Sequence, residues 1–358
     1  MSGAGREDGR AMTDPSGGGR RLWYGVVAVL LAATLLFWSL RGVEWARVWQ
    51  AIAHAHWEYL AGSMLVACVS FFLRSLRWRI LLNTNYRFGV GTVFMANMAG
   101  YLGNTFLPAR AGEFVRSYLI SSRSTLSKMY VLTTALSERV VDAMVLVRAS
   151  SVALAGVAAK PAWLGQISHA SALAAGAGLA AIAIVPHTGN LVERILRRLP
   201  LPERWQVRLG DLAAQVLGGL RTFHNVGRLG GFGLATGAIW TLDCLSVMVG
   251  ARALGIELSF RMALLLIAGM GLGSALPSTP GYVGVYQFVM VETLVPFGVS
   301  RDAALAYSLV NQAASSMLVV LRGLPGRLRA GDWRRALREE QEGAPVAGPA
   351  AQGRTPGS

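Results

Sequence analysis

The chain has 358 residues, of which 53% are hydrophobic and 15% are charged, and its formal net charge is +15. A soluble protein of this size carries roughly a quarter charged residues, whereas this sequence contains repeated apolar runs long enough to cross a bilayer. The composition therefore excludes an ordinary soluble domain. It predicts an all-α, polytopic integral membrane helical bundle of about 7–8 spans.

The charge and the cysteines narrow the class further. We attribute the positive charge to cytoplasmic loops and their attraction to anionic lipid headgroups, so we expect no nucleic-acid partner. The two cysteines, Cys68 and Cys244, both lie inside apolar runs. They are interpreted as packing residues, and we expect no disulfide framework, no metal site and no cofactor.

The N-terminal part is predicted to be a tail followed by a first span. Residues 1–20 lack apolar periodicity and are expected to form a disordered cytoplasmic tail, with a transmembrane domain over 21–325. The apolar run Leu22–Leu40 is longer than the apolar core of a typical signal peptide and is predicted to be an uncleaved span. The segment Trp45–Tyr59 is rich in tryptophan and is predicted to lie along the far membrane interface.

A second apolar run, from about Leu60 to Leu73, continues into a group of arginines. Arg74 and Arg77 are spaced to share one face of a helix. The positive-inside rule explains arginines at a cytoplasmic end, but it does not explain why the run stays apolar on both sides of them. Two interpretations therefore remain open, namely membrane anchoring and lipid-headgroup binding.

The next apolar stretch, Val90–Leu107, leads into a break at Asn104–Arg116. Pro108 and Gly112 interrupt any helix there. If the stretch crossed the bilayer completely, the basic residues that follow it would fall on the outer side, where they are scarce. We therefore predict a re-entrant hairpin, which keeps the following residues on the cytoplasmic side: Arg110, Arg116, Arg123 and Lys128.

The span Met129–Val157 carries three charged residues. Glu138 and Asp142 share a helix face, and Arg139 is close enough in sequence to pair with Asp142. Ionisable groups inside a membrane mark either a functional site or a buried charge partner. The charges are therefore predicted either to lock this helix to the first break, or to contact substrate directly, and the two roles are compatible.

A fifth, Ala/Gly-rich span is predicted to end near Val185, before a polar segment over residues 187–228. This segment is basic and is predicted to be cytoplasmic. Its apolar residues from Trp205 to Phe223 recur at helical spacing. They predict an amphipathic helix that lies either on the inner leaflet or beneath the bundle.

The second half of the chain contains another break, at Ala275–Gln287. It follows a sixth span, about Leu229–Val249, in which the lone carboxylate of Asp243 needs a partner, and Arg252 reaches it only from the helix end. The break is predicted to enter from the outer side, opposite to the first. Its helix-breaking residues are Pro277, Pro280, Gly281 and Gly284.

The last span is predicted over about Ala303–Leu321, with a cytoplasmic tail over 326–358 that is first basic and then disordered. Tyr307, Asn311 and Ser315 form a polar stripe along this span. The stripe either faces an internal cavity or makes interhelical hydrogen bonds.

Four sequence motifs, taken together and in order, resemble a known family. They are Arg74-Ser-Leu-Arg77-Trp78, Asn104-Thr-Phe-Leu-Pro108-Ala-Arg110-Ala-Gly112-Glu113, Glu138-Arg139-Val-Val-Asp142 and Pro277-Ser-Thr-Pro280-Gly281-Tyr-Val-Gly284. The chain resembles the lysylphosphatidylglycerol synthase transmembrane-region family, also called the flippase-like family, over roughly residues 20–325. In this sequence Tyr282 stands where the family's second proline motif usually has a second glycine.

The resemblance implies a membrane domain that handles a lipid or glycolipid. Full-length members move an aminoacylated lipid between leaflets and carry a soluble C-terminal synthase domain. We expect that domain to be absent here, so we do not carry its tRNA-dependent activity over, and we expect no enzyme. The resemblance and the intramembrane polar residues together give these candidate substrate-binding residues: Arg74, Arg77, Asn104, Arg110, Glu113, Arg116, Glu138, Arg139, Asp142, Pro277, Pro280, Gly281, Tyr307 and Asn311.

Three functions are compatible with these observations. The leading hypothesis is translocation of a phospholipid or polyprenyl-linked lipid in the cell membrane, without an ATP-binding loop and with both termini cytoplasmic. The alternatives are a secondary transporter of a small solute, and a non-transporting membrane partner of a glycosyltransferase or another lipid-modifying enzyme.

Overall fold

The computed structural model describes residues 16–83, 87–106, 111–154, 202–274 and 280–328, together with scattered residues between 173 and 198. The described part is all-helical and has no strand. The helices are α1 (Ser16–Leu40), α2 (Trp45–Ala53), α3 (Trp57–Leu82), α4 (Val90–Phe106), α5 (Gly112–Ser121), α6 (Lys128–Leu154), α9 (Glu203–Arg221), α10 (Val226–Arg252), α11 (Phe260–Gly273), α12 (Val285–Leu294) and α13 (Arg301–Leu328). Short 3-10 turns are η2 (Val185–His187), η3 (Thr222–His224), η4 (Pro280–Tyr282) and η5 (Val295–Phe297). The predicted all-α membrane fold is confirmed.

Within the described residues, three segments are long and apolar enough to cross a bilayer by themselves: α3, α10 and residues 301–321 of α13. A fourth span arises if Val26–Leu40 and Trp45–Ala53 count as one, although these two helices meet at a bend of 84°. Trp45 and Trp49 on α2 are exposed. Exposed indole rings on a short, sharply bent helix suit the membrane interface, which is where the sequence places this segment.

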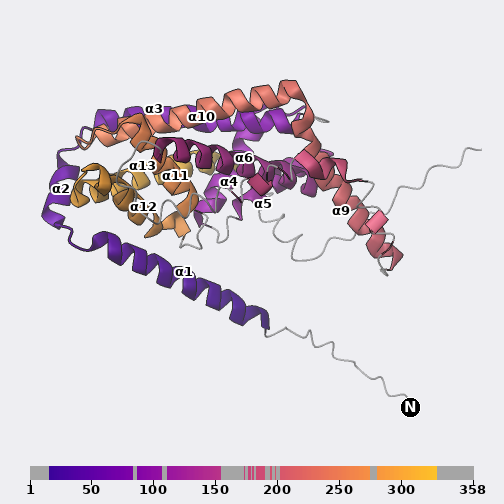
Figure 1. Ribbon diagram of the computed structural model, residues 1–358, viewed down its shortest axis with the longest axis horizontal. Helices are drawn as coiled ribbons and strands as arrows, with labels where there is room; N and C mark the ends of the chain where they lie inside the picture. The colour runs from indigo at the N-terminus through magenta and orange to yellow at the C-terminus, as the bar shows by residue number, and fades with distance from the viewer. Residues whose placement is uncertain are drawn as a thin grey trace, which may run out of the picture.

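The antiparallel pair α3 and α10 is the frame of the bundle (Figure 1). The Ser63 hydroxyl lies 3.2 Å from that of Ser246, and Arg77 reaches Thr236 further along the same pair. We call the end where α3 begins and α10 finishes the α2 end. We call the opposite end, where α9 leads into α10, the α9 end.

Two helical hairpins enter this frame from opposite ends. The α4–α5 hairpin starts from the α9 end, and the contacts of Gly100 with Arg116 and of Asn104 with Gly112 show that its two arms are antiparallel. The α11–α12 hairpin starts from the α2 end. Its arms are also antiparallel, because α11 glycines contact α12 side chains in reverse order along the chain: Gly269 against Val289 and Thr293, and Gly273 against Val285 and Val289.

The hairpins meet inside the bundle, where η4 contacts α4. Each break joins the two arms of one hairpin, as the sequence predicts for two re-entrant segments. Residues 107–110 and 275–279 lie outside the described residues, so nothing is assigned to Pro108, Arg110 or Pro277.

The first and last helices flank the second hairpin. α1 packs against α12, with the backbone of Ala32 directly against Gly284, and it begins at Ser16, inside the segment predicted to be a tail. α13 begins beside α2, where Asp302 accepts a hydrogen bond of 2.9 Å from the Glu44 amide. From there α13 runs back into the bundle, so the N-terminal end of α1 and the C-terminal end of α13 are both directed toward the α9 end (Figure 1).

One of the two arrangements that the sequence allows for the amphipathic helix α9 is seen directly, namely packing beneath the bundle. The C-terminal part of α9 and the η3 turn after it pack beneath the bundle, because Leu220 and Phe223 are buried and Gly219 lies against Thr133 of α6. Toward its N-terminal end, Trp205 and Leu212 stay exposed. Figure 1 shows this end of α9 projecting away from the other helices. Contact of this exposed part with the inner leaflet stays a prediction.

The close approach of α4 and α5 generates a test of the first hairpin. A methyl group at Gly112 would overlap the carbonyl oxygen of Gly100 and the backbone of Asn104, whereas one at Gly91 of α4 would meet nothing within 4 Å. We expect Gly112→Ala to destabilise the protein by about 1–3 kcal/mol. The matched change Gly91→Ala should leave stability unchanged or slightly raised. Thermal unfolding of the purified variants in detergent measures both, and equal midpoints would contradict the hairpin packing.

Candidate functional site

The centre of the bundle holds a network of opposite charges contributed by four helices. The four cations are Arg74 and Arg77 of α3, Arg116 of α5 and Arg139 of α6, and the four anions are Glu113 of α5, Glu138 and Asp142 of α6 and Asp243 of α10. The formal charges of these eight side chains cancel. Because isolated charges are costly inside a membrane, mutual pairing is the arrangement we expect for such a set.

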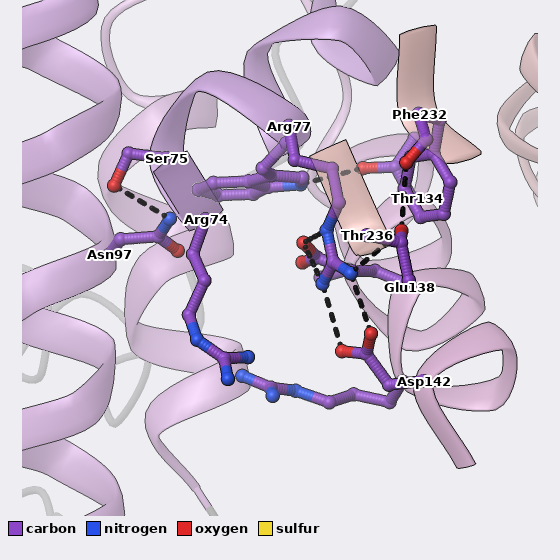
Figure 2. Close-up of polar contacts among 12 residues, drawn as sticks. Arg74, Ser75, Arg77, Asn97, Thr134, Glu138, Asp142, Phe232 and Thr236 are labelled. Carbon is purple, nitrogen blue, oxygen red and sulfur yellow. Dashed lines mark hydrogen bonds and ion pairs between the residues drawn. The ribbon is translucent and has the colours of Figure 1, made fainter. Parts of the chain in front are cut away.

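The Arg77 guanidinium is completely enclosed by partners, as Figure 2 shows. Its Nε and Nη2 donate to Glu138 Oε1 at 2.9 and 2.7 Å. Its Nη1 and Nη2 donate to the two Asp142 oxygens at 2.6 and 2.8 Å, and Nη1 also donates to Thr236 at 3.1 Å. A guanidinium has five N–H donors, so all five are used. Arg77 is 1% exposed and, in this arrangement, has no donor left for a ligand.

Arg116 connects the first hairpin to the same network. Its Nη1 donates to Asn97 at 2.8 Å and to Glu138 at 3.1 Å, and its Nη2 donates to the Ala135 carbonyl at 3.3 Å. The guanidinium also lies over the ring of Trp78, 4.5 Å from the centroid. Since Arg116 is 2% exposed, its contacts attach α5 to α4 and α6 in the interior of the bundle.

Two ion pairs differ from those the sequence suggested. Asp243 pairs with Arg74, not with Arg252, and it also accepts a hydrogen bond of 2.5 Å from Ser70. Arg74 and Asp243 face each other because α3 and α10 are antiparallel, which sequence spacing alone does not reveal. Arg139 does not pair with Asp142, because Arg77 occupies both Asp142 oxygens. Its Nε donates instead to Glu113 Oε1 at 3.0 Å.

A cavity of about 290 Å³ lies beside this network, where the two hairpins meet. The first hairpin and α6 contribute Tyr101, Asn104, Thr105, Glu113 and Arg139 to its wall. The second hairpin contributes Met270, Ser274, Tyr282, Val285 and Tyr286, and α3 and α13 add Phe71 and Val319. The cavity is therefore bounded by both helix breaks, and it has a charged side and a side of hydroxyl and apolar groups.

Arg139 and Glu113 are the charged groups that line the cavity. The Arg139 side chain is 28% exposed and lies over the Tyr101 ring. Among the described residues, its Nη atoms have no hydrogen-bond partner. Glu113 Oε2 lies 2.5 Å from Arg116 Nη2 as an ion pair. The approach is poorly directed, however, and this buried oxygen accepts no hydrogen bond from the described residues. Within the described residues, the cavity therefore presents the Nη donors of Arg139, whereas Glu113 Oε2 is buried behind its wall.

A chain of amides fixes the second break against α13. Gln287 accepts a hydrogen bond of 2.8 Å from the Gly284 amide and donates to Gln312 at 2.5 Å. Gln312 in turn donates to the Gly281 carbonyl at 2.7 Å. Tyr282 follows with φ +58°, in the left-handed region that favours glycine. These bonds hold an irregular backbone in place where it lines the cavity.

The structure divides the predicted site residues into groups. Asn104, Glu113 and Arg139 line the cavity. Gly281 belongs to the amide chain that fixes the cavity wall, and Asn311 donates to the lining Tyr286 hydroxyl at 2.6 Å. The residues that lie in the charge network instead are Arg74, Arg77, Arg116, Glu138 and Asp142.

The remaining predicted residues lie elsewhere. Tyr307 donates to the Val247 carbonyl at 2.8 Å and is fully buried, so it fixes α13 to α10 and does not face the cavity. Arg110, Pro277 and the side chain of Pro280 lie outside the described residues. Sequence reasoning left out Phe71, Tyr101 and Gln312. The amide of Gln312 on an apolar helix is the signal that could have pointed to the last of these.

The enclosure of Arg77 predicts a structural role that can be measured. Arg77→Met leaves Glu138 and Asp142 buried without their main cation, so we expect a loss of roughly 3–5 kcal/mol of stability or failure to fold. Adding Asp142→Asn to Arg77→Met should recover part of the loss, because one buried charge is removed. Arg47→Met, which breaks an exposed ion pair with Glu44 and a longer contact of 3.8 Å with Asp302, is the matched control and should cost under about 1 kcal/mol. Thermal unfolding in detergent compares the four proteins, and similar losses for Arg77→Met and Arg47→Met would refute the structural role.

Two known proteins are similar in sequence to this chain over most of its length. The chain is 25% identical over 340 residues to a protein named glycosyltransferase AglD from Haloferax volcanii, a match that covers 85% of this chain and 54% of that relative. It therefore spans about half the length of that relative. It is also 23% identical over 312 residues to a UPF0104 membrane protein from Methanothermobacter thermautotrophicus, covering 85% of this chain and 92% of the relative. No solved structure matches.

The family comparison agrees with the four sequence motifs. The model of the lysylphosphatidylglycerol synthase TM region matches residues 25–323, which include all the residues named above in the charge network and the cavity wall. This confirms the resemblance seen in the sequence. The chain belongs to the lysylphosphatidylglycerol synthase transmembrane-region family.

Proposed function

We propose that this protein moves an anionic or polyprenyl-linked lipid between the two leaflets of the cell membrane, without catalysing a chemical reaction. The observation that carries the proposal is the cavity between the two helix breaks, with Arg139 in its wall. Broken helices at membrane depth are tolerated where they line a cavity, and in transporters such breaks hold the substrate. Because the hairpins enter from opposite ends, a headgroup in the cavity between them would become accessible to either side after a small movement of one hairpin.

The lipid phosphate is assigned to Arg139. A guanidinium binds phosphate through two parallel hydrogen bonds, which a lysine ammonium cannot reproduce. Arg77 has all five donors engaged, and Arg116 is buried among Asn97, Ala135 and Glu138. Arg139 uses only Nε within the described residues, toward Glu113, and its two Nη groups are positioned for a ligand.

The proposal includes an orientation in the membrane. Basic residues outnumber acidic ones around the α9 end, including Arg79, Arg87, Arg123, Lys128, Arg204, Arg208, Arg221 and Arg228. The positive-inside rule therefore supports a cytoplasmic α9 end, toward which the outer ends of α1 and α13 are directed. Reporter fusions at the two termini should both report a cytoplasmic location. A signal from the outer side at either terminus overturns this topology.

The central test of the proposed function is an Arg139 variant in liposomes. Arg139→Gln removes the phosphate-binding fork, and we expect it to slow transfer of a labelled anionic lipid between leaflets by about tenfold or more. Arg139→Lys keeps the charge but loses the fork, so its rate should fall between Arg139→Gln and the parent. Arg47→Gln removes an exposed arginine outside the cavity, and it controls for the effect of losing any arginine on the transfer rate.

Folding of each variant is checked by its thermal unfolding midpoint before reconstitution. Parent-like transfer by a folded Arg139→Gln variant would remove Arg139 from the substrate path. Absence of transfer above empty liposomes by the parent itself would reject translocation altogether.

A second function is supported by one of the relatives. That relative is named a glycosyltransferase, and the present chain spans about half of its length. A protein of this kind could serve as the membrane partner of a lipid-modifying enzyme, presenting a lipid headgroup without moving it. A parent protein that binds lipid but does not transfer it in liposomes would favour this second function over translocation.

A further inference from the structure

The helix α9 and the η3 turn after it carry one apolar stripe, of which the two halves have different surroundings. Its members recur at steps of three and four residues along one face: Trp205, Leu209, Leu212, Val216, Leu220 and Phe223. The last three pack in the core cluster at the α9 end, whereas Trp205 and Leu212 are 47% and 41% exposed. Because α9 is one continuous helix, both halves of the stripe face the same way.

We propose that the N-terminal half of α9 binds the surface of an anionic leaflet, namely the leaflet beside the α9 end of the bundle. Trp205 and Leu212 enter the boundary between headgroups and acyl chains, and Arg204 and Arg208 contact the lipid phosphates. In the proposed orientation this leaflet is the cytoplasmic one. The described lining of the cavity includes no residue of α9, so this binding does not depend on lipid movement between leaflets.

The direction of the stripe identifies the bilayer as its occupant. In the second half the stripe faces the bundle, because Leu220 and Phe223 share a buried cluster with Tyr130 of α6. The bundle is embedded in lipid, so the same face meets the leaflet where α9 extends past the other helices (Figure 1). A soluble partner would approach the opposite face, where Asp211 and Ala214 are exposed.

Two arginines flank the exposed half of the stripe. Arg204 and Arg208 are exposed, and the Arg208 guanidinium lies 5.9 Å from the centroid of the Trp205 ring. A long basic side chain at the edge of an apolar face keeps its stem in the apolar layer while its charged head reaches the phosphates. An aromatic ring on the apolar side with arginines beside it is typical of helices that lie in the membrane interface.

The acidic residues of α9 do not cancel the attraction to an anionic surface. Glu203 and Asp211 offset Arg204 and Arg208 in number, but the neighbouring segments at the same end are basic. Their basic residues are Arg79, Arg87, Arg123, Lys128 and Arg228. Each basic residue near an anionic surface strengthens binding by about fivefold, and salt screens this gain.

The test places an environment-sensitive fluorescent label on either face of α9 in the full-length chain. Leu212→Cys carries the label on the stripe, and Ala214→Cys carries it on the opposite exposed face as the matched control. Both are made in a Cys68→Ala, Cys244→Ala background. Each protein is placed in phosphatidylcholine nanodiscs with or without about one-third phosphatidylglycerol. A lipid with a quencher near its headgroup and aqueous iodide report which phase the label meets.

We expect the lipid-borne quencher to act about threefold or more strongly on the label at position 212 than at position 214 when phosphatidylglycerol is present. The contrast should be weaker in phosphatidylcholine alone. Replacing both arginines, Arg204→Gln with Arg208→Gln, should lower the quenching at position 212 by about twofold or more, as should about 0.5 M NaCl. The thermal unfolding midpoint of each variant checks that it folds.

Four results overturn the proposal. Equal lipid quenching at positions 212 and 214 means that the stripe is not directed at the bilayer. Quenching at position 212 by iodide but not by lipid leaves the stripe in water, open to a soluble partner. Protection of position 212 from both quenchers means that another protein segment or a second copy covers it. Equal lipid quenching with and without phosphatidylglycerol rejects the preference for an anionic leaflet.

A measurement on the unmodified protein decides the question if the cysteine-free chain does not fold. Hydrogen–deuterium exchange over residues 203–215 of α9 should slow by about threefold or more when phosphatidylglycerol is added to the nanodiscs. Exchange in α11, which lies inside the bundle, is the internal control and should not change. Unchanged exchange over residues 203–215 overturns the proposal.

Discussion

The five hydrogen bonds of Arg77 are the constraint on which the rest of this bundle depends. They join α3 to Glu138 and Asp142 of α6 and to Thr236 of α10, deep in the interior. Removing a guanidinium and two carboxylates from water is costly, and the cost is offset only when every donor finds an acceptor in good geometry. Because Arg77 meets this condition with both carboxylates of α6, it fixes the rotation of α6 about its own axis. That rotation aims the neighbouring Arg139 away from Asp142 and toward Glu113 and the cavity.

The first hairpin is positioned by contacts of a different kind. Gly112 lies directly against the Gly100 carbonyl, and its amide donates to Asn104 at 2.9 Å. This close approach brings α5 near enough for Arg116 to reach Glu138, and it places Glu113 in the first turn of α5, at the cavity. The geometry between Glu113 and Arg139 therefore depends jointly on a glycine contact and on an ion-pair network.

The sequence predicted the elements of this fold better than it predicted their pairings. Hydropathy and the charge rule were sufficient to predict an all-α membrane bundle with two re-entrant breaks from opposite sides. Both features depend on properties of single segments, which the sequence shows directly. The partners predicted for Asp243 and Arg139 were wrong, because spacing along one helix does not show which helix lies opposite. Arg74 reaches Asp243 across 169 positions of sequence, a contact that only the antiparallel packing of α3 and α10 creates. Tyr101 and Phe71 were missed for the same reason, because an aromatic residue in an apolar run has the same pattern whether it faces lipid or a cavity.

The distribution of charge explains how one cluster can serve both stability and binding. The four arginines and four carboxylates described here cancel, so the network needs no ligand to be stable in the membrane. The pairing is nevertheless uneven: Arg77 is saturated, whereas Arg139 engages its partner through Nε and keeps its Nη groups at the cavity. A ligand phosphate can therefore bind without breaking an existing pair, and it can leave without exposing an unpaired charge.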